Sequence, residues 1–137
     1  MNAGDVMTRD PITVSSDDTV RTAIKLQLEN DIRHVPVVDE DGNLVGMLSD
    51  RDLRDATLPI WTRFEEPEKA REALDRPVSD LMQADTQSVT VEDDLGDVID
   101  IIIDHKIGAV PVVDAESARL VGIISYIDIL AAMRDEI

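Results

Sequence analysis

Two pairs of hydroxyl and carboxylate side chains share one spacing and are the residues in this chain best suited to chemistry. Ser49 stands three residues before Asp52, and Ser125 stands three residues before Asp128. Each pair follows a short apolar run and precedes a helical pattern, which places the serine at a helix start and the aspartate in the first turn. A carboxylate there can accept hydrogen bonds from a vicinal diol such as a ribose, each worth roughly 1.5–3 kcal/mol.

The same spacing has a purely structural interpretation. In a capping box, the serine hydroxyl accepts from a backbone N–H of the helix and the acid reaches back to the cap, which stabilises by about 1 kcal/mol. The helix N-terminus also favours a phosphate group. Capping and ligand binding are therefore both open and do not exclude each other.

Basic residues gather near the first pair and are missing near the second. The cluster near the first pair consists of Arg33, His34, Arg51 and Arg54. In the second half, Gly108, Ala109 and Ile127 stand in place of Arg33, His34 and Arg51, and Tyr126 stands in place of Asp50. None of the four replacements is charged. The cluster predicts two unequal sites, of which the first binds phosphate better. The alternative for the two helical arginines is a solvated face shared with Asp52 and Asp55.

Other kinds of site find little support in the sequence. The acidic run at 39–43 lacks the spacing of a calcium loop and predicts a hairpin turn. His34 and His105 are the two histidines, and without cysteines they do not predict a zinc site. There is no glycine-rich phosphate loop and no Ser/His/Asp set present in both halves, so we expect neither a metal nor an enzyme.

The elements that must position these residues can be predicted from apolar periodicity. In the first half we expect strands at 12–14, 35–38 and 44–48, a helix opening within 15–19, and a short helix at 50–56. In the second half we expect strands at 88–91, 110–113 and 120–124, and helices at 95–105 and 127–133. The segment 57–77 reads as a connector with a short helix at 68–74.

The two halves are copies of one unit. The run His34–Asp39 returns as Ala109–Asp114, and Asp5-Val6-Met7 returns as Asp80-Leu81-Met82. The predicted fold class is α/β (α+β), with two βαββα repeats packed about a pseudo-twofold axis. We expect a first repeat at 1–58, a connector at 59–77 and a second repeat at 78–137. Each half is near the size at which a lone core is marginal, so the halves should bury apolar surface together.

Charge and composition restrict the partners. The 137 residues carry 30 acidic and 13 basic side chains, for a net charge of −17. Such a surface repels nucleic acid, and it suits either adaptation to high salt or an ordinary acidic protein. The chain has no cysteine, no apolar run of membrane length and no signal peptide pattern, so we expect a cytoplasmic protein away from membranes.

The repeated motifs carry a family resemblance. An apolar-Pro-Val-Val-Asp run, a turn and then Gly-x-x-Ser-x-x-Asp occur twice in order, from about Val6 to Met133. The chain resembles a tandem pair of CBS (cystathionine β-synthase) domains, a Bateman module. The resemblance implies a stand-alone regulatory module that needs no cofactor. It would bind AMP, ADP or ATP, or S-adenosylmethionine as an alternative, in clefts between the repeats and signal by conformational change.

The resemblance also implies which residues bind. Ser49 with Asp52, and Ser125 with Asp128, would contact phosphate and ribose, and Arg33 would meet phosphate. Arg51 belongs with them through the basic cluster. The remaining implied contacts surround the adenine: Thr13, Ile32, His34, Val35 and Pro36 in the first half, and Thr90, Ile107, Ala109, Val110 and Pro111 in the second.

The implied partners are an adenosine-containing small molecule, a second copy in a homodimer, and a regulated protein that the sequence does not name. A different reading is a CBS pair that binds no ligand and serves as a dimerisation or docking unit. The intact Ser-x-x-Asp motifs and Arg33 favour ligand binding. An enzyme is the third class, since no nucleophile–base pair is evident.

Overall fold

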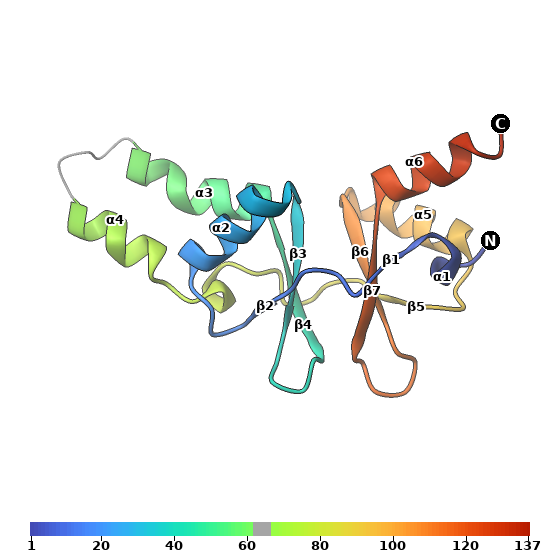
Figure 1. The fold of residues 1–137 in the computed structure, drawn as a ribbon, viewed down its shortest axis with the longest axis horizontal. Helices are drawn as coiled ribbons and strands as arrows, with labels where there is room; N and C mark the ends of the chain where they lie inside the picture. The colour runs from blue at the N-terminus through green and yellow to red at the C-terminus, as the bar shows by residue number, and fades with distance from the viewer. Residues whose placement is uncertain (62–66) are drawn as a thin grey trace. The chain divides into compact units, whose positions relative to one another are not determined.

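The computed structural model describes residues 1–61 and 67–137. The chain divides into two compact units of discontinuous sequence. Unit 1 contains residues 1–11, 41–44 and 85–137, and unit 2 contains residues 12–40 and 45–84. Each unit is a small sheet with helices (Figure 1). The α/β class predicted from the sequence is confirmed, and both repeats follow the expected βαββα order.

The sheet of unit 2 has the strand order β2-β3-β4. Its strands are β2 (Val14–Ser15), β3 (His34–Val38) and β4 (Leu44–Ser49), with β2 parallel to β3. Its helical elements are α2 (Val20–Asn30), α3 (Asp50–Trp61), α4 (Pro67–Leu74) and the short 3₁₀ helix η1 (Val78–Asp80). Helix α4 packs against α3 and α2, on one side of the sheet (Figure 1). The buried core lies between sheet and helices and includes Val35, Leu48 and Leu53.

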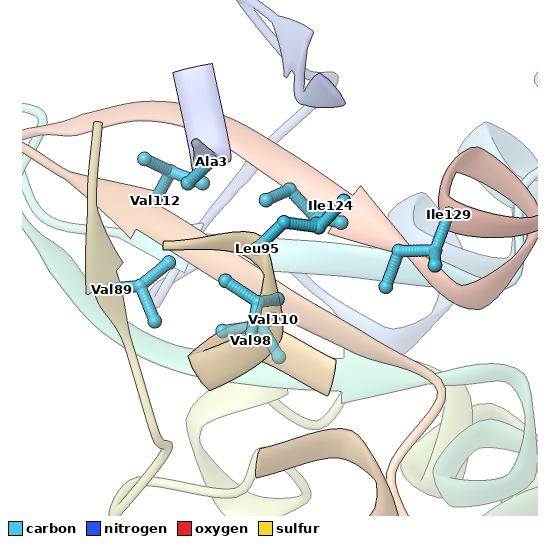
Figure 2. Close-up of a cluster of buried hydrophobic side chains, with 8 residues drawn as sticks. All are labelled: Ala3, Val89, Leu95, Val98, Val110, Val112, Ile124 and Ile129. Atoms are coloured by element: carbon cyan, nitrogen blue, oxygen red, sulfur yellow. The ribbon is translucent and has the colours of Figure 1, made fainter. Parts of the chain in front are cut away.

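The sheet of unit 1 has the order β1-β7-β6-β5. Its strands are β1 (Thr8–Arg9), β5 (Val89–Thr90), β6 (Ala109–Val113) and β7 (Leu120–Ser125). Its helices are α1 (Ala3–Val6), α5 (Leu95–His105) and α6 (Tyr126–Arg134). Figure 2 shows the core, in which Ala3 meets branched side chains from strands and helices. No helix in the described ranges is long and apolar enough to cross a membrane.

Local signals mark the limits of the corresponding helices α2 and α5. The Thr19 side chain accepts from the Thr22 N–H and caps α2, as the run of capping residues predicts. Asp31 follows α2 and Lys106 follows α5 as C-cap residues, and both adopt the left-handed conformation, with φ of 51° and 53°. This backbone reverses the chain so that the following strand starts three residues later.

Two features of the fold differ from the expected elements. Helix α3 continues to Trp61 instead of stopping at 56, so part of the expected connector is helical. Helix α4 packs against α3, and tertiary packing of this kind outweighs the turn signals of the sequence. The remainder of the connector includes Phe64, which lies outside the described residues. Neither α1 nor β1 was expected, because the first residues have no apolar periodicity.

The recurring Asp-x-Met segments join the units crosswise. The segment that opens the first repeat belongs to unit 1, where Thr8 pairs with Ile123 of β7. The segment that opens the second repeat belongs to unit 2, where Gln83 and Met47 exchange backbone hydrogen bonds of 2.8 and 3.0 Å. A second hydrogen bond holds each segment at an equivalent position. The Ala3 N–H donates to the Asp93 carbonyl in unit 1, and the Val78 N–H donates to the Asp18 carbonyl in unit 2, both at 2.8 Å.

A glycine accommodates each of these segments. A Cβ on Gly122 would lie 2.6 Å from the sulfur of Met7, and a Cβ on Gly46 would lie 2.7 Å from the sulfur of Met82. The same two Cβ atoms would also come within 3.0 Å of a backbone oxygen, from Thr8 and Gln83 respectively. Close approach of backbone therefore requires glycine at both positions, and it explains why the motif carries glycine twice.

We expect Gly46→Ala to destabilise the protein by about 1–3 kcal/mol, because the new methyl group overpacks against the Gln83 backbone as well as a flexible methionine. Urea unfolding monitored by circular dichroism measures the change. Gly96→Ala is the matched control: it lies in helix α5, where its Cβ meets a mobile Asp94 carboxylate, and alanine is favoured there by up to about 1 kcal/mol. Equal stability of Gly46→Ala and wild type would contradict the close approach.

Candidate functional site

Both Ser-x-x-Asp motifs form capping boxes. In unit 2 the Ser49 N–H donates to Asp52 Oδ2 at 2.9 Å, and the Asp52 N–H donates to Ser49 Oγ at 3.1 Å. In unit 1 the Ser125 N–H donates to Asp128 Oδ2 and the Asp128 N–H to Ser125 Oγ at the same two distances. The structural interpretation of the spacing is therefore confirmed in both repeats. The box orients each carboxylate and leaves its Oδ1 atom for other partners.

The two Oδ1 atoms differ in their surroundings. In unit 2 the Gln83 amide donates to Asp52 Oδ1 over a long 3.4 Å. Thr8 occupies the equivalent place in unit 1, one residue after its methionine, and Asp128 Oδ1 has no hydrogen-bond partner among the residues described. Sequence reasoning missed Gln83; the signal was its position directly after the recurring Asp-Leu-Met segment. The Asp52 carboxylate is therefore held more firmly than that of Asp128.

In each unit a backbone hydrogen bond joins the residue before β3 or β6 to the first residue of the helix α3 or α6. The Asp50 N–H donates to the Arg33 carbonyl at 2.8 Å, and the Tyr126 N–H donates to the Gly108 carbonyl at 3.0 Å. These bonds bring the start of β3, the end of β4 and the first turn of α3 together in what we call the unit 2 site: Arg33, His34, Ser49, Asp50, Arg51 and Asp52. They bring the start of β6, the end of β7 and the first turn of α6 together in the unit 1 site: Gly108, Ala109, Ser125, Tyr126 and Asp128.

His34 is a half-buried titratable group in the unit 2 site. Burial lowers the pKa of His34 below its usual value of about 6.5. The nearby carboxylate of Asp50 opposes this by raising the pKa, and Arg33 lowers it further. Desolvation prevails because removing the imidazolium from water costs more than the nearby carboxylate of Asp50 returns. His34 is therefore neutral above its lowered pKa and becomes charged as the pH falls or as an anion arrives.

The arginines of the unit 2 site are exposed. Within the ranges 1–61 and 67–137, neither Arg33 nor Arg51 forms an ion pair, and the same holds for Arg54 one turn further along α3. A guanidinium group without an internal carboxylate partner keeps its donors for an external oxyanion. Arg21, by contrast, pairs with Asp75 at 3.4 Å.

The other predicted contact residues fall into two groups. Val35, Pro36, Val110 and Pro111 are fully buried in their strands, and Ala109 is 6% exposed. Because their side chains are buried, these residues could contact a ligand through their main-chain atoms. The partly buried group lies at the ends of strands or helices: Thr13, Ile32, Thr90 and Ile107. Ile32 and Ile107 pack against the two cores.

The arrangement corresponds to a known family. The CBS domain family matches residues 3–58 and 78–135, and the chain belongs to it. The chain is a CBS pair, as the resemblance predicts. It is 33% identical over 128 residues to inosine-5′-monophosphate dehydrogenase of Methanocaldococcus jannaschii, with 93% of this chain covered. The match spans 23% of the dehydrogenase, so it concerns one part of that longer protein.

Solved structures show the same fold with bound ligands. CBSX2 in complex with AMP has a TM-score of 0.81 and 27% sequence identity, covering 99% of this chain and 98% of that chain. The CBS domain pair of protein MJ0100, in complex with 5′-methylthioadenosine and S-adenosyl-L-methionine, has a TM-score of 0.80 and 25% identity. That comparison covers 100% of this chain and 98% of the other.

His34 should make folding stability depend on pH. Since its folded pKa is lowered, the unfolded chain binds the proton more readily, so stability is present above about pH 6.5 and is lost as the pH falls toward the lowered pKa. His34→Ala, which installs the residue found at 109, should flatten this part of the dependence. Chemical unfolding at pH 7.5, 6.5 and 5.5 measures it. Parallel curves for the variant and wild type would contradict the burial of a neutral histidine.

Proposed function

We propose that this CBS pair is a regulatory module that binds an adenine nucleotide, AMP, ADP or ATP, and passes a conformational change to a partner protein. One observation carries the proposal: the unit 2 site places a capping-box carboxylate beside arginines that have no ion pair within the described residues. The AMP complex of CBSX2, which has the same fold, supports an adenosine ligand. S-adenosylmethionine is the alternative ligand, supported by the complex of MJ0100.

In the unit 2 site the acidic and basic side chains would bind different parts of the nucleotide. Asp52 keeps lone pairs on Oδ1 that accept from ribose hydroxyls, since the cap occupies Oδ2. Arg33 and Arg51 donate to the phosphate, and the first turn of α3 adds a favourable dipole. A net charge of −17 opposes an anionic ligand at long range, but at physiological salt charges beyond about 8 Å are largely screened. Local cations therefore decide the binding.

In this proposal the module has no reaction of its own. Ser49 and Ser125 each accept a backbone N–H in their capping box, and no hydrogen bond within the described ranges joins either to a histidine that would act as a base. Titration calorimetry with AMP, ATP and S-adenosylmethionine, at low and high salt, tests the function. Binding of at least one of them is expected. Absence of heat with all of them under both conditions would overturn the proposal.

We expect Asp52→Asn to weaken AMP binding by at least about tenfold while leaving the fold intact. The asparagine oxygen can still accept from the Ser49 N–H, but its amide group presents donors where the diol needs acceptors. Calorimetry with AMP and 2′-deoxy-AMP measures the effect, and the preference for the ribose form should disappear in the variant. An unchanged preference would show that Asp52 is a cap and nothing more.

A second candidate function, docking of one copy on another, is favoured by exposed apolar side chains on two helices of unit 1. Ile103 of α5 is 64% exposed, and Ile127 and Leu130 of α6 are 57% and 60% exposed; we call these three side chains the unit 1 face. Arginines replace the α6 pair in unit 2, and α4 packs on the helices there. We propose that a second copy covers the unit 1 face, because a twofold contact sets uncharged residues against themselves in an otherwise acidic protein.

Equivalent positions of the two repeats provide the test. Ile103→Arg should shift the protein toward monomer in light scattering, because it buries a charge in the contact. Leu28→Arg is the matched control: it occupies the same place on α2, is 79% exposed, and lies outside the unit 1 face. A wild-type monomer, or equal effects of the two variants, would contradict docking through this face.

A further inference from the structure

Three changes between the repeats coincide at one place in each unit. Arg33 corresponds to Gly108, His34 to Ala109 and Asp50 to Tyr126. The backbone bonds from Asp50 to Arg33 and from Tyr126 to Gly108 show that each trio is also adjacent in space. The three substitutions remove a guanidinium, an imidazole and a carboxylate of the unit 2 site and put one aromatic ring in their place, while the aspartate of the capping box is kept.

Tyr126 is exposed enough to meet a ligand. Its side chain is 40% exposed in the first turn of α6, two residues before Asp128. The neighbouring Gly108 has no side chain, and Ala109 has a small one that is 6% exposed. An exposed aromatic ring beside a glycine provides a surface on which a nucleobase can stack, a contact worth about 1–3 kcal/mol.

The Asp128 carboxylate suits a neutral ligand better than an anion. Its Oδ1 atom has no hydrogen-bond partner in the described ranges, so it can accept from a diol. No arginine stands at the positions of Arg33 or Arg51 to offset its charge. Lys106 stands two residues before Gly108, and it follows α5 as its left-handed C-cap residue, before the strand. A phosphate at this place would face a carboxylate without the guanidinium groups of unit 2.

We propose that the two sites divide adenosine compounds by the charge of the 5′ substituent. The unit 2 site takes the phosphorylated compound. The unit 1 site takes an uncharged adenine nucleoside, whose base stacks on Tyr126 and whose ribose hydroxyls donate to Asp128. The inference rests on the proposed function and adds the ligand class of each site. One module would then respond to the ratio of a nucleotide to its nucleoside.

AMP and adenosine test the division, because they differ only in the 5′-phosphate. The wild-type protein is saturated with AMP and then titrated with adenosine in a calorimeter. Adenosine should still bind, with one equivalent per chain. Complete displacement of one compound by the other would overturn the division while leaving nucleotide binding intact. Failure of both compounds to bind the wild-type protein would overturn the proposed function itself.

Variants assign each compound to its site. Tyr126→Ala should lower the affinity for adenosine, relative to that for AMP, by about tenfold, and Tyr126→Phe should restore it because the ring stays. The double variant Arg33→Gly/His34→Ala gives unit 2 the residues of unit 1 and should lower AMP affinity at least about tenfold relative to adenosine. An adenosine-to-AMP ratio unmoved by either change would overturn the assignment.

A charge control and a folding control complete the design. Lys25→Ala removes one positive charge from unit 2 outside the site, where Lys25 pairs with Glu29 on the exposed face of α2 at 3.9 Å. The affinities of Lys25→Ala for AMP and for adenosine should stay within twofold of the wild-type values. A loss of AMP affinity equal to that of the double variant would overturn a local role for Arg33 and His34. Thermal unfolding of every variant confirms that the folded protein is compared, and Tyr126→Phe serves where Tyr126→Ala fails to fold.

Discussion

Each sheet depends on a segment of chain from the start of the other repeat. Residues 1–11 complete unit 1, and the segment around Met82 and Gln83 completes unit 2. A repeat of about 60 residues buries too little surface to be secure alone, and here it also lacks an edge of its sheet without the borrowed segment. The crosswise connection makes the two units depend on each other through the chain. Gly46 and Gly122 are fixed by this requirement, since the borrowed backbone approaches them closely.

The borrowed segment also reaches the functional site. Gln83 holds Met47 by two backbone bonds and extends its amide toward Asp52, so the residue that closes the sheet also positions the carboxylate. The capping box holds the same carboxylate from the other side. If Asp52 binds a ligand as proposed, its structural and binding roles share one carboxylate. A change that loosens the sheet edge would then also loosen the proposed ligand acceptor, which gives a physical route from a conformational change to affinity.

Much of the fold could be predicted because the same pattern of motifs occurs in both halves of the sequence. Helix α5 spans Leu95–His105, the range that periodicity predicts, and the turn at Gly42, with φ of 82°, lies where the sequence places it. The capping boxes follow from spacing alone. The crosswise pairing could not be predicted, because β1 is two residues long and its partner β7 is over 110 residues away. Periodicity reports burial within one element and carries no information on which distant strand completes a sheet.

The duplication separates what the scaffold requires from what a ligand requires. Positions that serve the fold are alike in both repeats: the glycines under the methionines, the buried prolines of the strands, and the serine and aspartate of each box. Outside these positions the repeats differ at many places along the chain, such as Arg21 and Gly96 or Lys25 and Asp100. Among the differences are Arg33, His34 and Asp50, which correspond to Gly108, Ala109 and Tyr126 where β3 meets α3 and β6 meets α6. In the proposed division of ligands, Arg33 and Tyr126 are the residues that distinguish the two sites.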